Sequence, residues 1–335
     1  MDQDERGLVM TRHLNIVPDN FQDDKLRSYY DGTMPQGYGI GCDLDNFYVW
    51  KPAELTFILG ADGAGKTFNR AWYYVCLAEK NGITGDIYTN ENQVWSMKMK
   101  MISFHAGKHI TNLSEGDFYK HKTWVEGHFN FLDQEKIYDL DQLLDIFSST
   151  KKHFALIDPY NSMDIPDGSQ NEHLNNKKNL GKMRLFSNQT KKSLDVCMHP
   201  ATGKARMLHK SGEFEGQPVP LVKADVEGGQ IFPNRTDNFL ILHRYRTAAW
   251  KKSTFIDIAK IKEEETGGQT SNYGDALRLD FSEYKFTVNG VDPMTGDVEV
   301  PNQMFEIINP SGGMKNFIES EYPKEIEDSN DDIPF

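Results

Sequence analysis

One segment of the chain holds the residue types that bind phosphate, at the spacing this chemistry requires. Its residues are Gly60, Ala61, Asp62, Gly63, Ala64, Gly65, Lys66 and Thr67, and they match the P-loop pattern G-x-x-x-x-G-K-[ST]. The glycines let backbone N–H groups face phosphate oxygens, and a helix beginning near Lys66 adds a positive dipole. Lys66 would neutralise the β- and γ-phosphates, and the Thr67 hydroxyl would bind Mg²⁺. The segment predicts an ATP site with Mg²⁺ as cofactor.

Two acidic residues that follow later strand candidates would complete this chemistry. Asp158 ends the apolar run 154–157 and is the candidate second ligand of Mg²⁺. Glu91 follows the strand candidate 86–89 and is the candidate base that activates water. Ligands of parallel sheets bind at the carboxyl ends of strands, so both carboxylates are expected to converge on the P-loop. The alternatives are a helix N-cap for Asp158 and a helix-start acid for Glu91.

A histidine and a group of cations follow a further strand candidate, 194–198. His199 ends this strand, where a neutral imidazole would sense the γ-phosphate. The Gly-, Lys- and Pro-rich segment 201–224 is expected to be a mobile loop. The cations of this region are Lys191, Lys192, Lys204, Arg206 and Lys210. We interpret the last three as DNA contacts; a solvated surface loop is the equally weighted alternative.

The elements that must position these residues alternate between strand and helix. Strands are expected at 55–59, 86–89, 124–132 (centred on 129–132), 153–157, 194–198, 238–243 and 254–259, helices at 68–78, 94–106, 140–147 and 177–191, and an antiparallel ribbon at 277–281 and 285–288. This order predicts an α/β fold with a mainly parallel central sheet flanked by helices.

Composition limits the class of protein. The chain has 335 residues, a net charge of −13 and three widely spaced cysteines, which suggest neither a disulfide framework nor a zinc site. No apolar run is long enough for a bilayer, and the polar N-terminus is no signal peptide, so we expect no membrane partner and a cytoplasmic protein, in the host cytoplasm for a viral one. We expect an N-terminal arm at 1–35, an ATPase domain at 36–312 and an acidic disordered tail at 313–335.

Taken together, these blocks resemble the RecA-like motor domain of DnaB/Twinkle-like hexameric replicative DNA helicases over roughly residues 30–285. The matching blocks are 37–48, 51–56, the P-loop, 89–93 around Glu91, 157–161 around Asp158, His199-Pro200, 225–229, 236–238 and 259–267. Each block is unspecific alone, and their common order and spacing carry the resemblance.

The resemblance implies a RecA-like P-loop NTPase that hydrolyses ATP in a hexameric ring and moves 5′–3′ along single-stranded DNA. It also implies that a neighbouring subunit contributes Lys260 and Lys262 to each ATP site. The family usually has Arg in the place of Lys262, and Lys lacks the planar fork that stabilises a transferring phosphoryl group. Arg244 or Arg246 is a candidate substitute, and slower or differently coupled hydrolysis is expected.

The C-terminal end gives a separate indication. The chain is acidic from Glu319, and its last residues are Asp331, Asp332, Ile333, Pro334 and Phe335. This end resembles the C-terminal tip of bacterial single-stranded-DNA-binding proteins, which implies docking on replication proteins. A disordered acidic arm with a terminal Phe would reach a basic rim and fill an apolar pocket. The alternative is a solubilising tail.

Three functions remain open from the sequence. The first is an ATP-driven helicase. The second is a DNA-binding RecA-like ATPase that does not unwind and acts in recombination or loading, which the Lys at position 262 favours. The third is a small-molecule kinase, for which no lid or acceptor site is readable in the sequence.

Overall fold

The computed structural model describes residues 17, 20–163, 172–205, 207–272 and 274–297. The chain divides into two compact units, 1–36 and 37–335. The first contains the helix α2 (Asp23–Tyr30), in which no residue is buried. The predicted acidic tail and its last five residues lie outside the described part of the chain.

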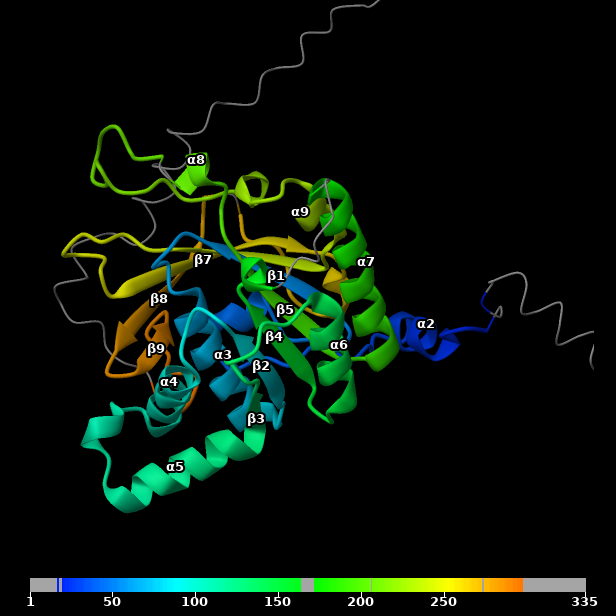
Figure 1. The fold of residues 1–335 in the computed structure, drawn as a ribbon, viewed down its shortest axis with the longest axis horizontal. Coiled ribbons are helices and arrows are strands. Elements are labelled where there is room, and N and C mark those ends of the chain that lie inside the picture. The colour runs from blue at the N-terminus through cyan, green and yellow to red at the C-terminus, as the bar shows by residue number, and fades with distance from the viewer. Residues whose placement is uncertain (1–16, 18–19, 164–171, 206, 273, 298–335) are drawn as a thin grey trace, which may run out of the picture. The chain divides into compact units, whose positions relative to one another are not determined.

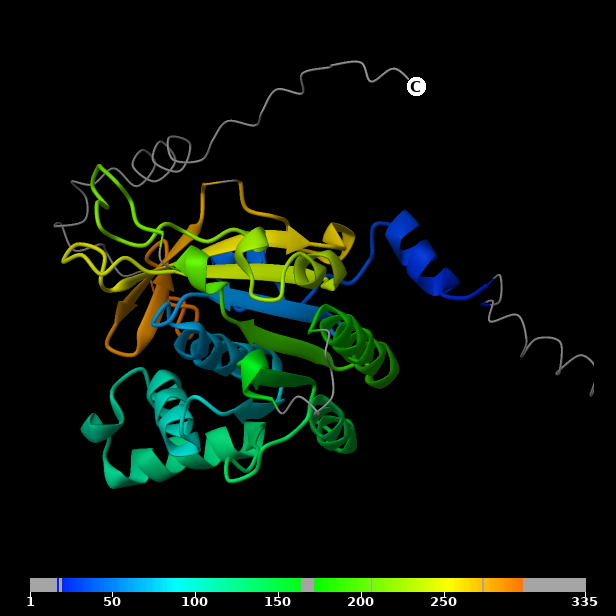
Figure 2. The same cartoon turned by 45° about the horizontal axis from the view of Figure 1, so that its top comes forward.

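A nine-stranded sheet forms the centre of the second unit, as far as the described residues show it (Figures 1 and 2). Its strands are β1 (Leu55–Gly60), β2 (Gly85–Thr89), β3 (Phe129–Phe131), β4 (Phe154–Asp158), β5 (Ser193–Met198), β6 (Asn238–His243), β7 (Ser253–Ile261), β8 (Leu277–Ser282) and β9 (Lys285–Val288). The spatial order is β3-β2-β4-β5-β1-β6-β7-β8-β9. The strands β1 to β6 pair with one another in parallel, and β7, β8 and β9 join them by antiparallel pairing. The predicted α/β fold with a mainly parallel sheet is confirmed.

Helices cover both faces of this sheet (Figures 1 and 2). The longer ones are α3 (Lys66–Asn81), α4 (Val94–Ala106), α5 (Glu115–His128), α6 (Leu140–Ser149) and α7 (Glu172–Thr190), and the short ones are α8 (Thr202–Ala205) and α9 (Ile231–Arg235). Single 3-10 turns lie at Asp43–Asn46, Ile110–Asn112, Tyr160–Ser162, Lys223–Asp225 and Glu264–Thr266. One core packs α3 and α4 against the sheet, and the other packs α6, α7 and α9 against the opposite face.

The sequence explains why the central strands lie inside. All six residues of β1 and all five of β4 are buried, as expected for parallel strands covered on both faces. Helix α3 ends at Gly82, whose φ of 68° lies in the left-handed region that favours glycine. Helix α6 begins with a capping box in which Asp139 and Gln142 each bind the other's backbone N–H.

The segment 124–132 differs from the prediction. Only 129–131 form a strand, and the residues before it belong to α5, a helix the sequence analysis missed. Trp124 stacks between His105 and His128 at centroid distances of 3.8 and 4.1 Å, and Val125 is fully buried. The β-favouring residues here therefore pack a helix against α4, since tertiary contacts override local propensity.

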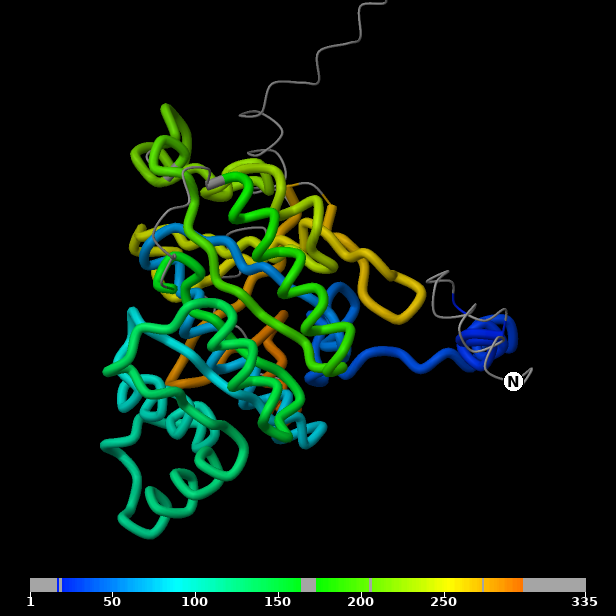
Figure 3. The backbone as a smooth tube through the Cα atoms, turned by 45° about the vertical axis from the view of Figure 1, so that its right-hand side comes forward, coloured from blue at the N-terminus to red at the C-terminus, as the bar shows by residue number. Residues whose placement is uncertain are grey.

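Two further boundaries differ. Helix α7 begins at Glu172, earlier than the predicted start at 177. Within the predicted mobile loop 201–224, residues 207–219 form a hairpin in which Leu208 bridges Pro218. The backbone N–H of His209 donates to Gln217 O at 2.9 Å, and that of Val219 donates to Met207 O at 2.9 Å. Figures 1 and 3 show this hairpin and α5 at opposite ends of the second unit.

Parallel pairing gives the sheet two distinct edges. At the carboxyl edge, the ends of β1, β2, β4, β5 and β6 lead into the P-loop, Glu91, Asp158, His199 and Arg244. At the amino edge, the start of β6 lies beside the end of β7, because Asn238 pairs with Ile261 in the antiparallel direction. The predicted catalytic residues are therefore divided between two sides of the sheet.

Candidate nucleotide site

The P-loop connects β1 to α3 and is shaped by its glycines. Gly63 and Gly65 have φ angles of 75° and 91°, in the left-handed region that side chains disfavour. Gly65 is the N-cap residue of α3, so the free N–H groups of the first helical turn lie next to the loop. This arrangement can bind an anion without any side chain.

Lys66 and Thr67 at the start of α3 are held by hydrogen bonds. Lys66 is buried, and its Nζ donates to Gly60 O at 2.7 Å. The Thr67 hydroxyl donates to Asp158 Oδ2 at 2.5 Å and accepts from Asn92 Nδ2 at 3.2 Å. The structure therefore brings the two predicted Mg²⁺ ligands into direct contact.

Asp158 is fully buried at the end of β4. Burial raises the pKa of its carboxyl group, and the Thr67 hydroxyl, the Cys197 thiol and the Lys66 ammonium oppose that rise. Apart from the weak thiol donor of Cys197, Oδ1 of Asp158 has no hydrogen-bond partner among the residues described. A buried carboxylate oxygen without a strong partner, next to a hydroxyl, fits Mg²⁺, which prefers oxygen ligands and keeps several waters.

Glu91 and His199 meet at the same edge although 108 positions separate them in the chain. His199 Nε2 lies 3.0 Å from Glu91 Oε1, and His199 Nδ1 lies 3.1 Å from Asp62 Oδ1. The imidazole thus links the candidate base to the P-loop itself. The sequence predicted the positions of Glu91 and His199 but gave no signal for the contact with Asp62, which occupies a variable position of the motif.

Two arginines after β6 lie against the P-loop of their own chain. A Cβ atom on Gly65 would lie 3.7 Å from Arg244 Cδ, and one on Gly63 would lie 2.7 Å from Arg246 Nη2. Arg246 Nη2 donates to Asp62 O at 3.2 Å. Burial lowers the pKa of Arg244, with the charge of Arg246 adding to the effect. These contacts favour a role for Arg244 within one chain, and its action on a neighbouring subunit stays a prediction.

Lys262 lies far from this site, at the amino edge. Its Nζ is 3.5 Å from Asp237 Oδ1, and Asp237 also pairs with both Nη atoms of Arg184. Lys260 Nζ donates to Pro233 O at 2.7 Å. The structure does not bring Lys262 together with the P-loop of the same chain.

The predicted DNA-contacting cations have different environments. Lys204 is half exposed and forms an ion pair with Asp225 at 3.3 Å, and Lys210 is exposed on the 207–219 hairpin. Arg206 lies outside the described residues. Lys191 is exposed.

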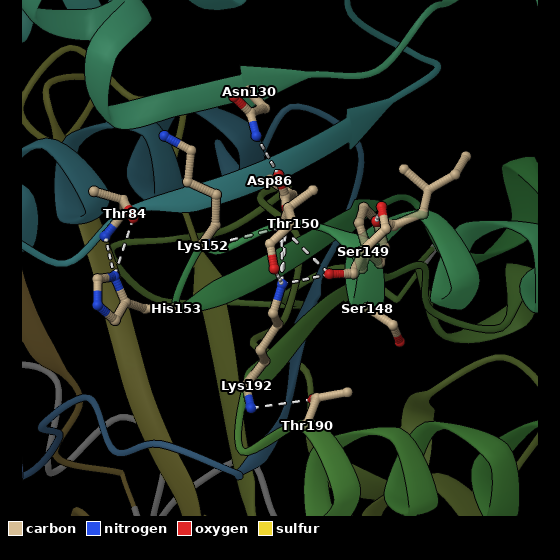
Figure 4. A network of polar contacts seen from close by, with 12 residues as sticks. Thr84, Asp86, Asn130, Ser148, Ser149, Thr150, Lys152, His153, Thr190 and Lys192 are labelled. Carbon is tan, nitrogen blue, oxygen red and sulfur yellow. Dashed lines mark hydrogen bonds and ion pairs between the residues drawn. The ribbon is translucent and has the colours of Figure 1, made fainter.

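Lys192, which like Lys191 is not among the predicted DNA contacts, has a structural role. Its Nζ donates to Thr150 O and Thr150 Oγ1, each at 2.8 Å, and to Phe147 O. It lies 3.9 Å from the buried carboxylate of Asp86, which also accepts from Asn130 (Figure 4). Lys192 therefore binds the last carbonyls of α6 and neutralises a buried charge, a role that only the tertiary fold reveals.

Two kinds of feature are absent from the described residues. None of their helices has the length and apolarity that a membrane crossing requires. Nor do they contain a cluster of three or more His, Cys, Asp or Glu side chains suited to a metal ion.

Comparison with known proteins gives one relative and two solved structures of note, and no protein-family model matches the chain. The Twinkle homolog protein, chloroplastic/mitochondrial, of Arabidopsis thaliana is 25% identical over 247 residues, covering 67% of this chain. The match covers 33% of that relative, so the chain spans about a third of its length.

The two structures share the fold. A solved ATPase domain matches with a TM-score of 0.60 at 13% identity, covering 79% of this chain and 97% of that one. A DnaB-like replicative helicase, described with its interactions with primase, matches with a TM-score of 0.60 at 12% identity, covering 81% and 66%. The resemblance found in the sequence is confirmed: the chain has the RecA-like fold of DnaB-like ATPase domains and is similar in sequence to a Twinkle homolog. The likeness of its C-terminal tip stays a prediction.

Proposed function

We propose that this chain is the motor of an ATP-hydrolysing DNA helicase of the hexameric replicative type, moving along single-stranded DNA. The observation that carries the proposal is the convergence of five residues at the carboxyl edge of the sheet. These residues are Lys66, Thr67, Asp158, Glu91 and His199. The RecA-like fold and the sequence similarity to a Twinkle homolog support it.

Each residue has a role that its geometry supports. Lys66 exchanges its hydrogen bond with Gly60 O for phosphate oxygens, and the N–H groups of the P-loop bind the rest of the anion. Glu91 takes the proton of the attacking water. Thr67 and Asp158 would hold Mg²⁺, which, when bound, neutralises charge on the β- and γ-phosphates. His199 holds Glu91 before nucleotide binds and then responds to the γ-phosphate.

The position of Lys262 supports a ring of subunits. Lys262 is half exposed at the edge opposite its own P-loop, so it can act on a nucleotide only where a second copy presents its carboxyl edge. The hexamer, the 5′–3′ direction and the transfer of Lys260 and Lys262 to a neighbouring site follow from the family resemblance. Arg244, next to the P-loop in the same chain, would supply a guanidinium that Lys262 lacks.

The partners follow from the same reasoning. Lys204, Arg206 and Lys210 would contact the DNA backbone. The C-terminal residues Asp331, Asp332, Ile333, Pro334 and Phe335 would dock on replication proteins. We place the protein in the cytoplasm, or in the host cytoplasm for a viral protein.

The alternative is a RecA-like ATPase that binds DNA without unwinding it and acts in recombination or loading. One observation favours it: Lys stands at position 262, where an arginine would stabilise the transferring phosphoryl group more strongly. Weak hydrolysis with firm DNA binding would suit such a factor.

One experiment separates these functions. The full-length protein is incubated with ATP, Mg²⁺ and single-stranded DNA, and phosphate release is followed together with the separation of a forked duplex. We expect DNA to stimulate phosphate release and the fork to separate. Stimulated release without separation favours the alternative, and release that ignores DNA contradicts both.

A further inference from the structure

The P-loop residue Asp62 has two contacts that point in different directions. Its carboxylate meets His199 at the end of β5, and its backbone oxygen accepts a hydrogen bond from Arg246 Nη2 after β6. The first contact links the P-loop to Glu91 and belongs to the site described above. The second leads away from the site toward the 207–219 hairpin.

Arg246 binds the P-loop and the hairpin at the same time. Its guanidinium donates to Asp62 O at 3.2 Å, and its backbone N–H donates to the Gln217 side chain at 2.8 Å. Gly63 makes the first contact possible, because a Cβ atom there would lie only 2.7 Å from Arg246 Nη2. Arg246 therefore connects the P-loop directly to the 207–219 hairpin.

The hairpin and the turn that holds Arg246 form one packed unit. Phe214 at the hairpin stacks on Tyr245 at a centroid distance of 3.9 Å and an interplanar angle of 17°. Trp250 Nε1 donates to Glu213 Oε1 at 3.0 Å. Phe214, Tyr245 and Phe255 make a separate small core, so a shift of the turn carries the hairpin with it.

We propose that Arg246 is a positioning residue that transmits the nucleotide state of the P-loop to the 207–219 hairpin through Gln217. A triphosphate in the cradle places negative charge next to the Arg246 guanidinium, which draws the 244–247 turn toward the P-loop. The hairpin, which presents the exposed Lys210, changes position with that turn. The inference rests on the proposed function only for the statement that the hairpin contacts DNA.

The coupling works in both directions by thermodynamic necessity. If nucleotide changes the position of the hairpin, a polynucleotide that favours one position changes the affinity for nucleotide by the same factor. This relay is separate from the one through His199, because it leaves the P-loop on the β6 side of β1, whereas His199 ends β5 on the other side.

Hydrogen exchange of the full-length protein without DNA tests the relay directly. The probe is a non-hydrolysable ATP analogue with Mg²⁺, and the readout is exchange of the hairpin amides, which donate within the hairpin. We expect the analogue to change hairpin exchange at least about fivefold in the wild type and to lose this effect in Arg246→Gln, measured at saturating analogue. Arg246 is exposed, so the substitution does not threaten the fold. Lys252→Gln removes a positive charge elsewhere in the connection between β6 and β7 and should keep the response.

Two results overturn the proposal. One is a wild-type hairpin whose exchange is the same with and without bound analogue, and the other is Arg246→Gln with an undiminished response. Neither result depends on DNA, so the relay can fail while the proposed helicase function stands.

A second variant measures the consequence for DNA. Gln217→Leu removes the acceptor of the Arg246 N–H and lies outside the catalytic site. We expect phosphate release without DNA to stay within about twofold of the wild type and stimulation by single-stranded DNA to fall at least about fivefold. Full stimulation in this variant contradicts the relay, whereas a wild type without stimulation contradicts the proposed function instead.

Discussion

The two edges of the parallel strands use the same residue types in opposite ways. At the amino edge, buried charges are matched: Asp86 accepts from Asn130 and Thr150 beside Lys192, and Asp237 pairs with Arg184. At the carboxyl edge, Asp158 is equally buried but keeps an oxygen without a strong partner among the described residues.

The difference shows that burial alone does not tell whether a charged side chain has a structural or a functional role. A buried charge with a complete set of partners contributes to one conformation of the fold, and removing a partner is costly. A buried carboxylate oxygen without a strong partner at the edge of the sheet is available to a ligand. The comparison therefore predicts that substitutions at the carboxyl edge damage turnover and those at the amino edge damage stability.

Lys66→Ala should have the largest effect on turnover. Loss of the ammonium removes the charge that binds the phosphates, so phosphate release should fall by about four orders of magnitude, while the melting temperature changes by a few degrees at most. Phosphate-release assays and thermal unfolding check this pair of outcomes. A variant that melts far lower and still turns over would break the comparison between edges.

Glu91→Gln should have the next largest effect on turnover. The amide still accepts from His199 but cannot take a proton, so we expect turnover to fall about a thousandfold with nucleotide affinity nearly unchanged. Binding of a fluorescent ATP analogue and single-turnover hydrolysis measure the two quantities separately. Wild-type turnover in this variant would remove Glu91 as the base.

Lys192→Met tests the amino edge. The variant leaves the carbonyls of Phe147 and Thr150 without their donor and the buried Asp86 without its nearest cation. We expect the free energy of unfolding to fall by about 3 kcal/mol, with turnover of the folded protein retained. The control is Lys191→Met, the same change at the exposed neighbouring position, which should cost less than about 0.5 kcal/mol. Equal losses in the two variants would contradict the structural role of Lys192.

Lys262→Ala asks whether the amino edge also takes part in catalysis. If a neighbouring subunit uses this cation, turnover should fall about a hundredfold without loss of stability. Mixing the variant with Lys66→Ala subunits provides a sharper measurement, because each protein supplies what the other lacks across an interface. Recovery of phosphate release in the mixture indicates a shared site, and normal turnover of Lys262→Ala alone would confine the amino edge to stability.

Part of the pH dependence of stability should come from His105 in α4. Burial, with the charges of His121, His128 and Lys120 adding to it, lowers the pKa of His105 from 6.5 to about 4. In the window between these values the unfolded chain binds a proton that the folded chain does not, so stability is full above pH 6.5 and falls with decreasing pH. Between pH 7 and pH 5 we expect a loss of about 2 kcal/mol from His105. Denaturant unfolding should show a smaller loss in His105→Asn, and an unchanged loss would assign the effect elsewhere.

The sequence predicted the carboxyl edge well because its signals are local. A glycine loop between a strand and a helix, or an acid after an apolar run, can be recognised within about ten residues, and parallel topology then places these ends together. Lys66, Asp158, Glu91 and His199 met as expected for this reason.

The amino edge and the hairpin were not predictable because their partners are distant in the chain. The sequence shows Lys192 only as one of a group of cations near the 201–224 segment, since its acceptors lie more than 40 positions away at the end of α6. The 207–219 hairpin depends on stacking between Phe214 and Tyr245, and α5 depends on packing around Trp124. No spacing within the chain reports such contacts, because they join segments that only the tertiary fold brings together.

The hydrogen bond from Lys66 to Gly60 O has a consequence for the release of nucleotide. The Lys66 ammonium has a hydrogen-bond acceptor when the P-loop holds no nucleotide. Release of the product therefore leaves no buried cation without a partner. When nucleotide binds, Lys66 exchanges its hydrogen bond to Gly60 O for one to phosphate. The binding free energy is therefore a modest difference between two hydrogen-bonded states. For the proposed motor, which would bind and release nucleotide in every cycle, such a site favours release of the product over tight retention.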